Sequence, residues 1–177
     1  MPVAIAIAGR MGSGKTTLSK DLANALECVR ASFGDYVRGA VQERGLSPSR
    51  DNLQVVGTEL LIGDPVGFCG SVLSSCGWQP GMDLVIDGLR HLITIPIIRR
   101  LIEPAGIKIV YISVPEQVRL ERLKARGEGD ACDIARIESH SSEQDLQSVA
   151  QIADLAVRGD RPRDANVSEI AAWLRNQ

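Results

Sequence analysis

Hydrophobic positions along the chain follow two patterns that alternate from one end to the other. Short apolar runs rich in β-branched residues, typical of buried strands, occur at five places: Val3–Ala8, Val29–Phe33, Leu84–Ile86, Ile107–Val114 and Ala153–Val157. Between them, apolar residues spaced three or four positions apart predict helices at Thr16–Leu26, Tyr36–Arg44, Asp51–Ile62, Pro65–Leu73, Leu92–Leu101, Pro115–Arg126 and Val167–Leu174. Strands that alternate with helices indicate parallel β-α-β units. We therefore expect an α/β fold with a five-stranded parallel sheet and helices on both faces.

Particular residues predict where some of these helices begin. Asp51 is expected to cap the helix that follows it, and Asp35 is a candidate cap for the helix at Tyr36. Pro65 is expected to open another helix, because its missing N–H costs nothing in a first turn. Pro96 is expected to kink its helix or to mark the first turn.

Length and composition indicate one ordinary globular domain. The chain has 177 residues, of which 44% are hydrophobic and 24% charged, which excludes disordered and fibrous architectures. Its net charge of −2 argues against bulk binding of nucleic acid, which requires a basic surface. With only 3% aromatic residues, the chain also has few rings on which single-stranded bases would stack.

The chain carries no segment that predicts a membrane or secreted protein. No apolar run reaches the roughly 20 residues of a membrane span, and the N-terminal apolar stretch is interpreted as a strand because a glycine-rich loop follows it. The four cysteines lie far apart without any C-x-x-C pair: Cys28, Cys69, Cys76 and Cys132. We expect reduced structural thiols and a cytoplasmic protein.

The most specific motif lies between the first strand and the first helix. Gly9–Thr16 (GRMGSGKT) matches G-x-x-x-x-G-K-[ST], the phosphate-binding loop, in the strand–loop–helix context that the motif requires. Its glycines let backbone N–H groups point at phosphate oxygens at the N-terminus of a helix. Lys15 is expected to bridge the outer phosphates and the Thr16 hydroxyl to bind Mg²⁺. The expected ATP-binding residues of the loop are Gly12, Ser13, Gly14, Lys15, Thr16 and Thr17.

A second segment resembles a known family of small-molecule kinases. Ser32–Gly45 (SFGDYVRGAVQERG) is similar to the acceptor-binding segment of adenylate-kinase-like nucleoside monophosphate kinases. In that family a Gly-Asp pair precedes an arginine that reaches the phosphate of the acceptor. The resemblance implies this role for Arg38, with Gly34 and Asp35 as the pair. Residues 32–75 are accordingly expected to form an acceptor-binding insertion.

Two further segments resemble the same family, and they follow in the family's order. Asp83–Arg90 (DLVIDGLR) is similar to its strand ending in Asp-Gly, which implies that Asp87 holds Mg²⁺ through water and that Arg90 clamps the acceptor phosphate. Val114–Arg126 (VPEQVRLERLKAR) resembles the helix that leads into the lid. The resemblance implies that Arg122 packs against the ATP base and that Arg126 contacts the transferring phosphates.

The segment after this helix is interpreted as a short lid. Gly127–Asp133 is rich in glycine and poor in apolar residues, which predicts a mobile loop, and the lid is expected to span residues 127–136. Arg136 is expected to move inward with it as a further catalytic arginine. Arg119 lies off the family's positions and is expected on a solvated helix face.

Three matches bear on the acceptor. Asn52–Leu61 (NLQVVGTELL) and His140–Leu146 (HSSEQDL) resemble segments of phage-type deoxynucleoside monophosphate kinases, and Gln54 is a candidate for reading a base edge. The short lid and Ala135–Ile137 also resemble dephospho-coenzyme A kinases. The family's long lid and the proline before its arginine are missing, and Cys132 alone cannot build a four-cysteine zinc lid. A (deoxy)nucleoside monophosphate is the expected acceptor, with ATP and Mg²⁺; dephospho-coenzyme A or another small metabolite is the alternative.

A nucleotide-dependent switch or an ATPase without an acceptor is the alternative from a different class. The segment Asp64–Gly67 (DPVG) forms a D-x-x-G that favours a GTPase-like switch. No N-K-x-D motif follows it, and Gly63 and Pro65 fit a loop better than a strand end. His91 and His140 have no pattern for metal binding or acid–base work, and local hydrogen bonds are expected for both.

Overall fold

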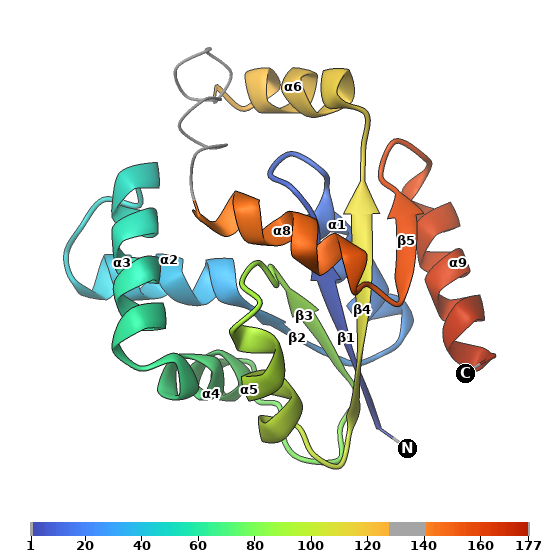
Figure 1. The fold of residues 1–177 in the computed structure, drawn as a ribbon, viewed down its shortest axis with the longest axis horizontal. Coiled ribbons are helices and arrows are strands. Elements are labelled where there is room, and N and C mark those ends of the chain that lie inside the picture. The colour runs from blue at the N-terminus through green and yellow to red at the C-terminus, as the bar shows by residue number, and fades with distance from the viewer. Residues whose placement is uncertain (1, 128–140, 177) are drawn as a thin grey trace.

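A single parallel sheet forms the centre of the protein. The structure is a computed structural model that describes residues 2–127 and 141–176 (Figure 1). Its strands are β1 (Val3–Ala8), β2 (Val29–Ser32), β3 (Leu84–Asp87), β4 (Gly106–Ser113) and β5 (Leu155–Arg158). They pair in parallel in the order β2-β3-β1-β4-β5, which confirms the expected five-stranded parallel sheet.

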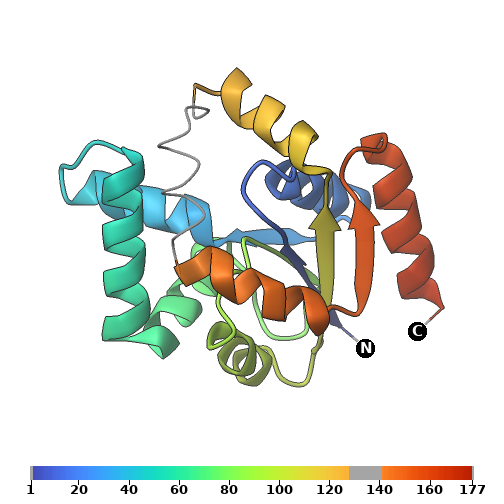
Figure 2. The same ribbon diagram turned by 45° about the horizontal axis from the view of Figure 1, so that its top comes forward.

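Helices cover both faces of this sheet. They are α1 (Lys15–Ala25), α2 (Phe33–Glu43), α3 (Arg50–Gly63), α4 (Pro65–Ser75), α5 (Thr94–Leu101), α6 (Glu116–Ala125), α8 (Ser141–Gln151) and α9 (Arg163–Arg175). Figures 1 and 2 show α8 and α5 against one face, with α1 and α9 on the opposite side. Strand β1 is apolar at every position because both of its faces are covered in this way.

The two faces carry two separate cores, and β1 contributes to both. Its alanines Ala4, Ala6 and Ala8 pack with the residues of α4, α5 and α8, whereas Ile5 and Ile7 pack with α1 and α9. All five side chains are at most 1% exposed. The alternation follows from the twofold period of a strand.

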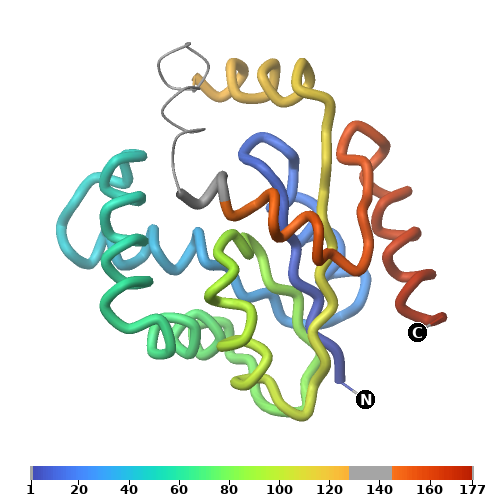
Figure 3. The backbone as a smooth tube through the Cα atoms, in the orientation of Figure 1, coloured from blue at the N-terminus to red at the C-terminus, as the bar shows by residue number. Residues whose placement is uncertain are grey.

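Helices α2, α3 and α4 form one continuous excursion between β2 and β3. Figure 3 traces this excursion beside the sheet, with α3 farthest from the strands. Aromatic rings join its first and last helices, since Phe33 and Tyr36 of α2 lie 5.3 and 5.8 Å from Phe68 of α4, centroid to centroid. The excursion is the segment in which an acceptor-binding insertion was expected.

Two predicted helix caps are wrong, because both helices begin earlier in the chain. Ser32 caps α2 and Ser49 caps α3, each hydroxyl accepting a hydrogen bond from the backbone N–H three residues on. Asp35 and Asp51 therefore lie inside the first turns, where a carboxylate is favoured by the positive end of the helix dipole. Pro96 lies in the first turn of α5, as one of its two predicted roles required.

Two elements near the C-terminus also differ in their bounds from the prediction. Strand β5 begins at Leu155 rather than at Ala153, and α9 begins at Arg163 rather than at Val167. The first turn of α9 carries Arg163 and Asp164, which face solvent, so its hydrophobic pattern starts one turn after the helix itself.

The D-x-x-G of the switch alternative is a helix cap. Asp64 Oδ1 accepts a hydrogen bond from the N–H of Gly67 at 2.8 Å, and Pro65 opens α4. This contradicts the reading of Asp64–Gly67 as a switch motif after a strand. Within the described residues no single helix has the length and apolar content to cross a membrane; α3 and α4 meet that criterion only together, and they are bent by 116° at this point.

We predict that Asp64→Ala lowers the free energy of unfolding by about 1 kcal/mol, the usual cost of losing an N-cap. Asp64→Asn is the matched control and is expected to keep stability, because asparagine caps equally well. Urea denaturation measures both. Nucleotide affinity is expected to stay unchanged in both variants, and loss of it in Asp64→Ala would restore the switch interpretation.

Candidate active site

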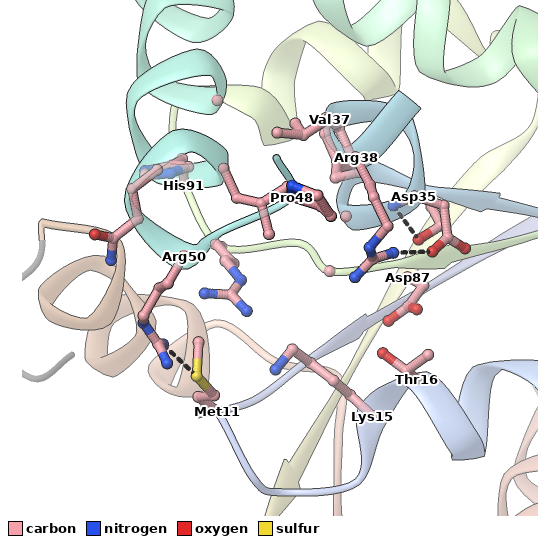
Figure 4. A pocket seen from close by; sticks show the side chains of 18 of the residues that line it. Met11, Lys15, Thr16, Asp35, Val37, Arg38, Pro48, Arg50, Asp87 and His91 are labelled. Carbon is pink, nitrogen blue, oxygen red and sulfur yellow. Dashed lines mark hydrogen bonds and ion pairs between the residues drawn. The ribbon is translucent and has the colours of Figure 1, made fainter. Parts of the chain in front are cut away.

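A cavity of about 870 Å³ opens where β1, β2 and β3 end. Its walls come from the phosphate-binding loop, from the start of α2, from α3 and from the residues after β3 (Figure 4). Ligands of open parallel sheets bind outside the carboxyl ends of the strands. The predicted site residues that line it are Gly12, Gly14, Lys15, Thr16, Thr17, Asp35, Arg38, Gln54, Asp87, Arg90 and Arg126.

The phosphate-binding loop has the backbone that its glycines were expected to permit. Gly14 has φ of 96° and is the N-cap of α1, a conformation that costs little only for glycine. Lys15 is 7% exposed, and its Nζ donates to the carbonyl of Arg10 at 3.2 Å. Ser13, in the same loop, is buried and does not line the cavity. The loop thus presents Lys15 and the start of α1 to an anion.

Thr16 and Asp87 provide oxygens suited to Mg²⁺. Figure 4 shows the Thr16 hydroxyl and the Asp87 carboxylate facing each other. Asp87 is 3% exposed; its Oδ2 accepts from Arg30, and within the described part of the chain its Oδ1 has no hydrogen-bond partner. A buried carboxylate oxygen normally has a partner, and a hydrated Mg²⁺ would supply one. Among the described residues no three His, Cys, Asp or Glu side chains cluster as metal ligands, so the ion would also need phosphate oxygens.

Arginines and apolar side chains form the opposite wall. Arg38 Nη1 donates to Asp35 Oδ1 at 2.8 Å, and Arg90 lies at the same wall after β3. The apolar part of the wall comes from α2, α3 and α4: Phe33, Val37, Leu53, Leu61 and Phe68. Gln54 of α3 is half-buried and lies among them. The wall therefore combines cations for an anionic group with an apolar surface and an amide.

Asp35 is held as a carboxylate by its neighbours. Burial raises the pKa of Asp35, but the hydrogen bond from Arg30 and the charges of Arg30 and Arg38, with a hydrogen bond from Ser32, outweigh it. The net effect lowers the pKa below its ordinary value of 3.8. At neutral pH Asp35 is ionised and orients Arg38.

Helix α6 contributes two of the three arginines predicted for the donor side. Arg122 lies outside the cavity lining; its Nη1 donates to the Ser13 carbonyl at 3.1 Å and its Nη2 to the Gly159 carbonyl at 2.8 Å. Arg126, at the end of α6, lines the cavity. Arg136 and the expected lid from residue 128 onward lie outside the described residues, as do His140 and Cys132.

Arg119 is not on a solvated face, contrary to the prediction. It is 1% exposed, and its guanidinium donates twice to Glu116, including Nε to Oε2 at 3.0 Å. Arg10 of the phosphate-binding loop donates to the same Oε2 at 3.0 Å. A Cβ on Gly12 would come within 3.1 Å of Arg119, so the loop packs directly on this side chain. Arg119 is buried because α6 lies on the loop rather than in solvent.

The sequence interpretation did not assign to the site the residues of its apolar wall, nor Arg30, Arg50 and Met11. Arg30 of β2 bonds both Asp87 and Asp35. Figure 4 shows that Arg50, at the start of α3, reaches Met11 of the phosphate-binding loop. Arg30 could have been found as the charged residue inside an otherwise small and apolar strand, in the strand adjacent to Asp87. Arg50 and Met11 carry no comparable signal.

One histidine and three of the cysteines lie within the described residues. His91 Nδ1 lies 3.2 Å from Asp145 Oδ2, a contact that joins the segment after β3 to α8. Cys28, Cys69 and Cys76 are free thiols. Burial raises the pKa of Cys69 to about 11, so it remains a thiol at neutral pH.

Two of the solved structures with the same fold are named as kinases. A putative kinase from Chloroflexus aurantiacus superposes with a TM-score of 0.63 at 19% identity, covering 99% of this chain and 97% of that one. A shikimate kinase from Bacteroides thetaiotaomicron gives 0.60 at 19% identity, covering 98% of both chains. The sheet order, the phosphate-binding loop and these likenesses define a P-loop domain with a kinase-like fold.

Sequence comparisons show the family. A family model described as an AAA domain matches residues 5–145. A UPF0200 protein of Methanosarcina mazei is 30% identical over 145 residues, which is 80% of this chain and 75% of that protein. The chain therefore belongs to this AAA domain family and to the UPF0200 proteins. Another member, from Aeropyrum pernix, is 31% identical over 69% of this chain, and the match spans 64% of its own length, less than two thirds.

A further match covers a short part of the chain. A cytidylate kinase of Haloarcula marismortui is 48% identical over 44 residues, 25% of this chain and 23% of that protein.

We predict a pH-dependent contribution of Glu116 to stability. The hydrogen bond from Arg119, and the charges of Arg119 and Arg10, lower the pKa of Glu116 below its ordinary value of 4.5. A carboxyl whose pKa is lowered by folding stabilises the fold fully above its unfolded pKa, and the contribution is lost as pH falls through the folded pKa. Glu116→Gln should therefore lower Tm at pH 7, and its Tm should approach the wild-type Tm as the pH falls below 4.5. Glu121→Gln on the same helix is the control, and an equal pH trend in both variants would contradict the prediction.

Proposed function

We propose that this protein transfers the γ-phosphate of ATP to a small acceptor that carries a phosphate, with a (deoxy)nucleoside monophosphate as the acceptor class. One observation carries the proposal. A single cavity is lined both by the groups of a phosphate-binding loop, Lys15 and Thr16, and by Arg38 and Arg90 on a wall built from other segments. A site for a nucleotide alone would not need the second set of cations.

The chemistry requires positioning and positive charge rather than a base. An oxygen of the acceptor phosphate forms a bond to the γ-phosphorus while the bond from that phosphorus to the bridging oxygen breaks, and charge spreads over the equatorial oxygens. Lys15 would hold the donor phosphates, and Arg38 and Arg90 would bind the acceptor phosphate through paired hydrogen bonds. Arg126 would stabilise the transferring group. Mg²⁺, held at Thr16 and Asp87, would neutralise the oxygens of the donor phosphates.

A nucleotide acceptor is supported by the apolar wall and by a partial likeness. Phe33, Leu53 and Phe68 offer a surface against which a flat base packs, and Gln54 has both a donor and an acceptor for its edge. The short match to a cytidylate kinase is consistent with a pyrimidine nucleotide.

A second candidate acceptor is a small metabolite with a hydroxyl group, such as dephospho-coenzyme A or a sugar acid. A hydroxyl must lose a proton during transfer, so a base is useful. His91 lines the cavity, and Asp145 lies within hydrogen-bond distance of its ring. His91→Gln separates the candidates, because transfer to a phosphate acceptor should tolerate it and transfer to a hydroxyl should not.

The proposal is tested by a coupled assay for ADP release across all ribo- and deoxyribonucleoside monophosphates, dephospho-coenzyme A, shikimate and gluconate. We expect Mg²⁺-dependent release that one class of acceptor stimulates. Lys15→Ala should reduce it by several orders of magnitude with an unchanged circular dichroism spectrum, since its described contacts lie in a loop. Slow release that no acceptor changes would instead support an ATPase or a switch.

We predict that Arg38 and Arg126 act on different kinetic constants. Arg38→Ala should raise the KM of the acceptor roughly tenfold or more, because it loses a charge-assisted hydrogen bond made in the ground state as well. Arg126→Ala should lower kcat about 10²- to 10³-fold, because its target charge shifts during transfer. Arg44→Ala, at a surface ion pair with Glu59, is the control. If Arg38→Ala instead lowered kcat and Arg126→Ala raised the KM of the acceptor, the assignment of the two arginines to the acceptor and donor sides would be reversed.

A further inference from the structure

Arg30 lies behind the cavity and joins two carboxylates of the site. It stands on β2, with a side chain that is 15% exposed. Its Nη1 donates to Asp87 Oδ2 at 2.9 Å and its Nη2 to Asp35 Oδ2 at 2.6 Å. One guanidinium therefore lies between the aspartate assigned to Mg²⁺ and the aspartate that orients Arg38.

The remaining oxygens of the two carboxylates differ in their contacts. Asp35 Oδ1 accepts from Arg38, whereas Asp87 Oδ1 is buried and has no hydrogen-bond partner in the described part of the protein. The Asp87 side chain is 4% exposed and the Asp35 side chain 52%. A chain of contacts therefore runs from Asp87 through Arg30 to Asp35 and on to Arg38.

We propose that Arg30 is a positioning residue that takes the place of a second divalent cation between Asp87 and Asp35. It keeps one oxygen of Asp87 for a single Mg²⁺ and keeps Asp35 turned toward Arg38. The assignment of Asp87 to Mg²⁺ requires only that a nucleotide binds at the phosphate-binding loop. The role of Arg38 toward an acceptor rests on the proposed function.

Physical chemistry favours an arginine in this place. Two carboxylates that converge in a partly buried site attract a divalent cation, because Mg²⁺ and Mn²⁺ prefer carboxylate oxygens. A fixed guanidinium neutralises both, and its charge repels a second ion at short range. The planar fork also binds two oxygens at once in a defined geometry, which an ammonium group does not do.

Binding of Mn²⁺ to the nucleotide-free protein tests the proposal without any acceptor. Electron paramagnetic resonance reports the free ion, and Mn²⁺ uses the same oxygen ligands as Mg²⁺. We expect Arg30→Gln to bind Mn²⁺ at least tenfold more tightly than the wild type. Arg30→Lys keeps the charge, so its Mn²⁺ affinity should equal that of the wild type. In the double variant Arg30→Gln with Asp35→Asn, the Mn²⁺ affinity should return toward the wild-type value. With ADP present, the wild type should bind one Mn²⁺ and Arg30→Gln two.

Acceptor kinetics provide the second readout. Arg30→Gln and Asp35→Asn should each raise the KM of the acceptor about tenfold with little change in kcat, because Arg38 loses its fixed partner. Arg44→Gln removes a comparable arginine from an exposed pair and should change neither KM nor Mn²⁺ affinity.

The outcomes separate the two proposals. Unchanged Mn²⁺ affinity in folded Arg30→Gln, or two Mn²⁺ ions bound to the wild type with ADP, overturns the role of Arg30. The number of Mn²⁺ ions that the wild type binds with ADP tests the role of Arg30 even if Arg30→Gln does not fold. Absence of any stimulating acceptor, with the Mn²⁺ results as expected, overturns the proposed function and leaves Arg30 as the residue that limits the site to one cation.

Discussion

Strands β1 and β3 pair in parallel with Ile7 opposite Asp87, and the N–H of Gly88 donates to the carbonyl of Ile7 at 3.3 Å. Because the chain leaves both strands at the same edge, this register places the phosphate-binding loop beside Asp87 and Arg90. The adjoining pair, Ser32 with Asp87, brings the start of α2 to the same edge. Three segments that are distant in the sequence thereby meet around one cavity, and each depends on the hydrogen bonds of the central strands.

Helix α6 holds the phosphate-binding loop in place. Glu116 binds Arg10 of the loop and Arg119 of the helix, while Arg122 binds carbonyls of the loop and of Gly159 after β5. The loop is therefore enclosed by side chains from outside the motif. Arg119, which the helical pattern predicts to face solvent, instead bonds Glu116, and Arg122 connects α6 with the loop and with the residues after β5.

The strands, most of the helices and the loop were predictable because each has a local signal. Buried parallel strands are continuously apolar, and the glycine motif has a fixed spacing. Arg119 and Arg30 have no such local signal. Arg119 is buried against the phosphate-binding loop and Arg30 bonds Asp87 of β3, and both partners are far away in the sequence. The caps of α2 and α3 were misplaced because Asp35 and Asp51 satisfy the same preference as the serines three and two residues before them. The roles of Arg38, Arg90 and Arg126 were inferred from a resemblance, and the structure brings them to one cavity without testing those roles.

The excursion α2–α3–α4 supplies most of the apolar wall from one contiguous stretch of chain, whereas the phosphate-binding loop belongs to β1 and α1. Within the described residues its helices also add seven buried side chains to the sheet core: Val37, Val41, Val56, Phe68, Cys69, Val72 and Leu73. Arg50 of the same stretch reaches Met11 of the phosphate-binding loop, and Asp35 binds Arg30, which also binds Asp87. Replacing this stretch would therefore change the cavity wall, part of the sheet core and the contacts of the phosphate-binding loop together, so none of the three can vary independently of the others.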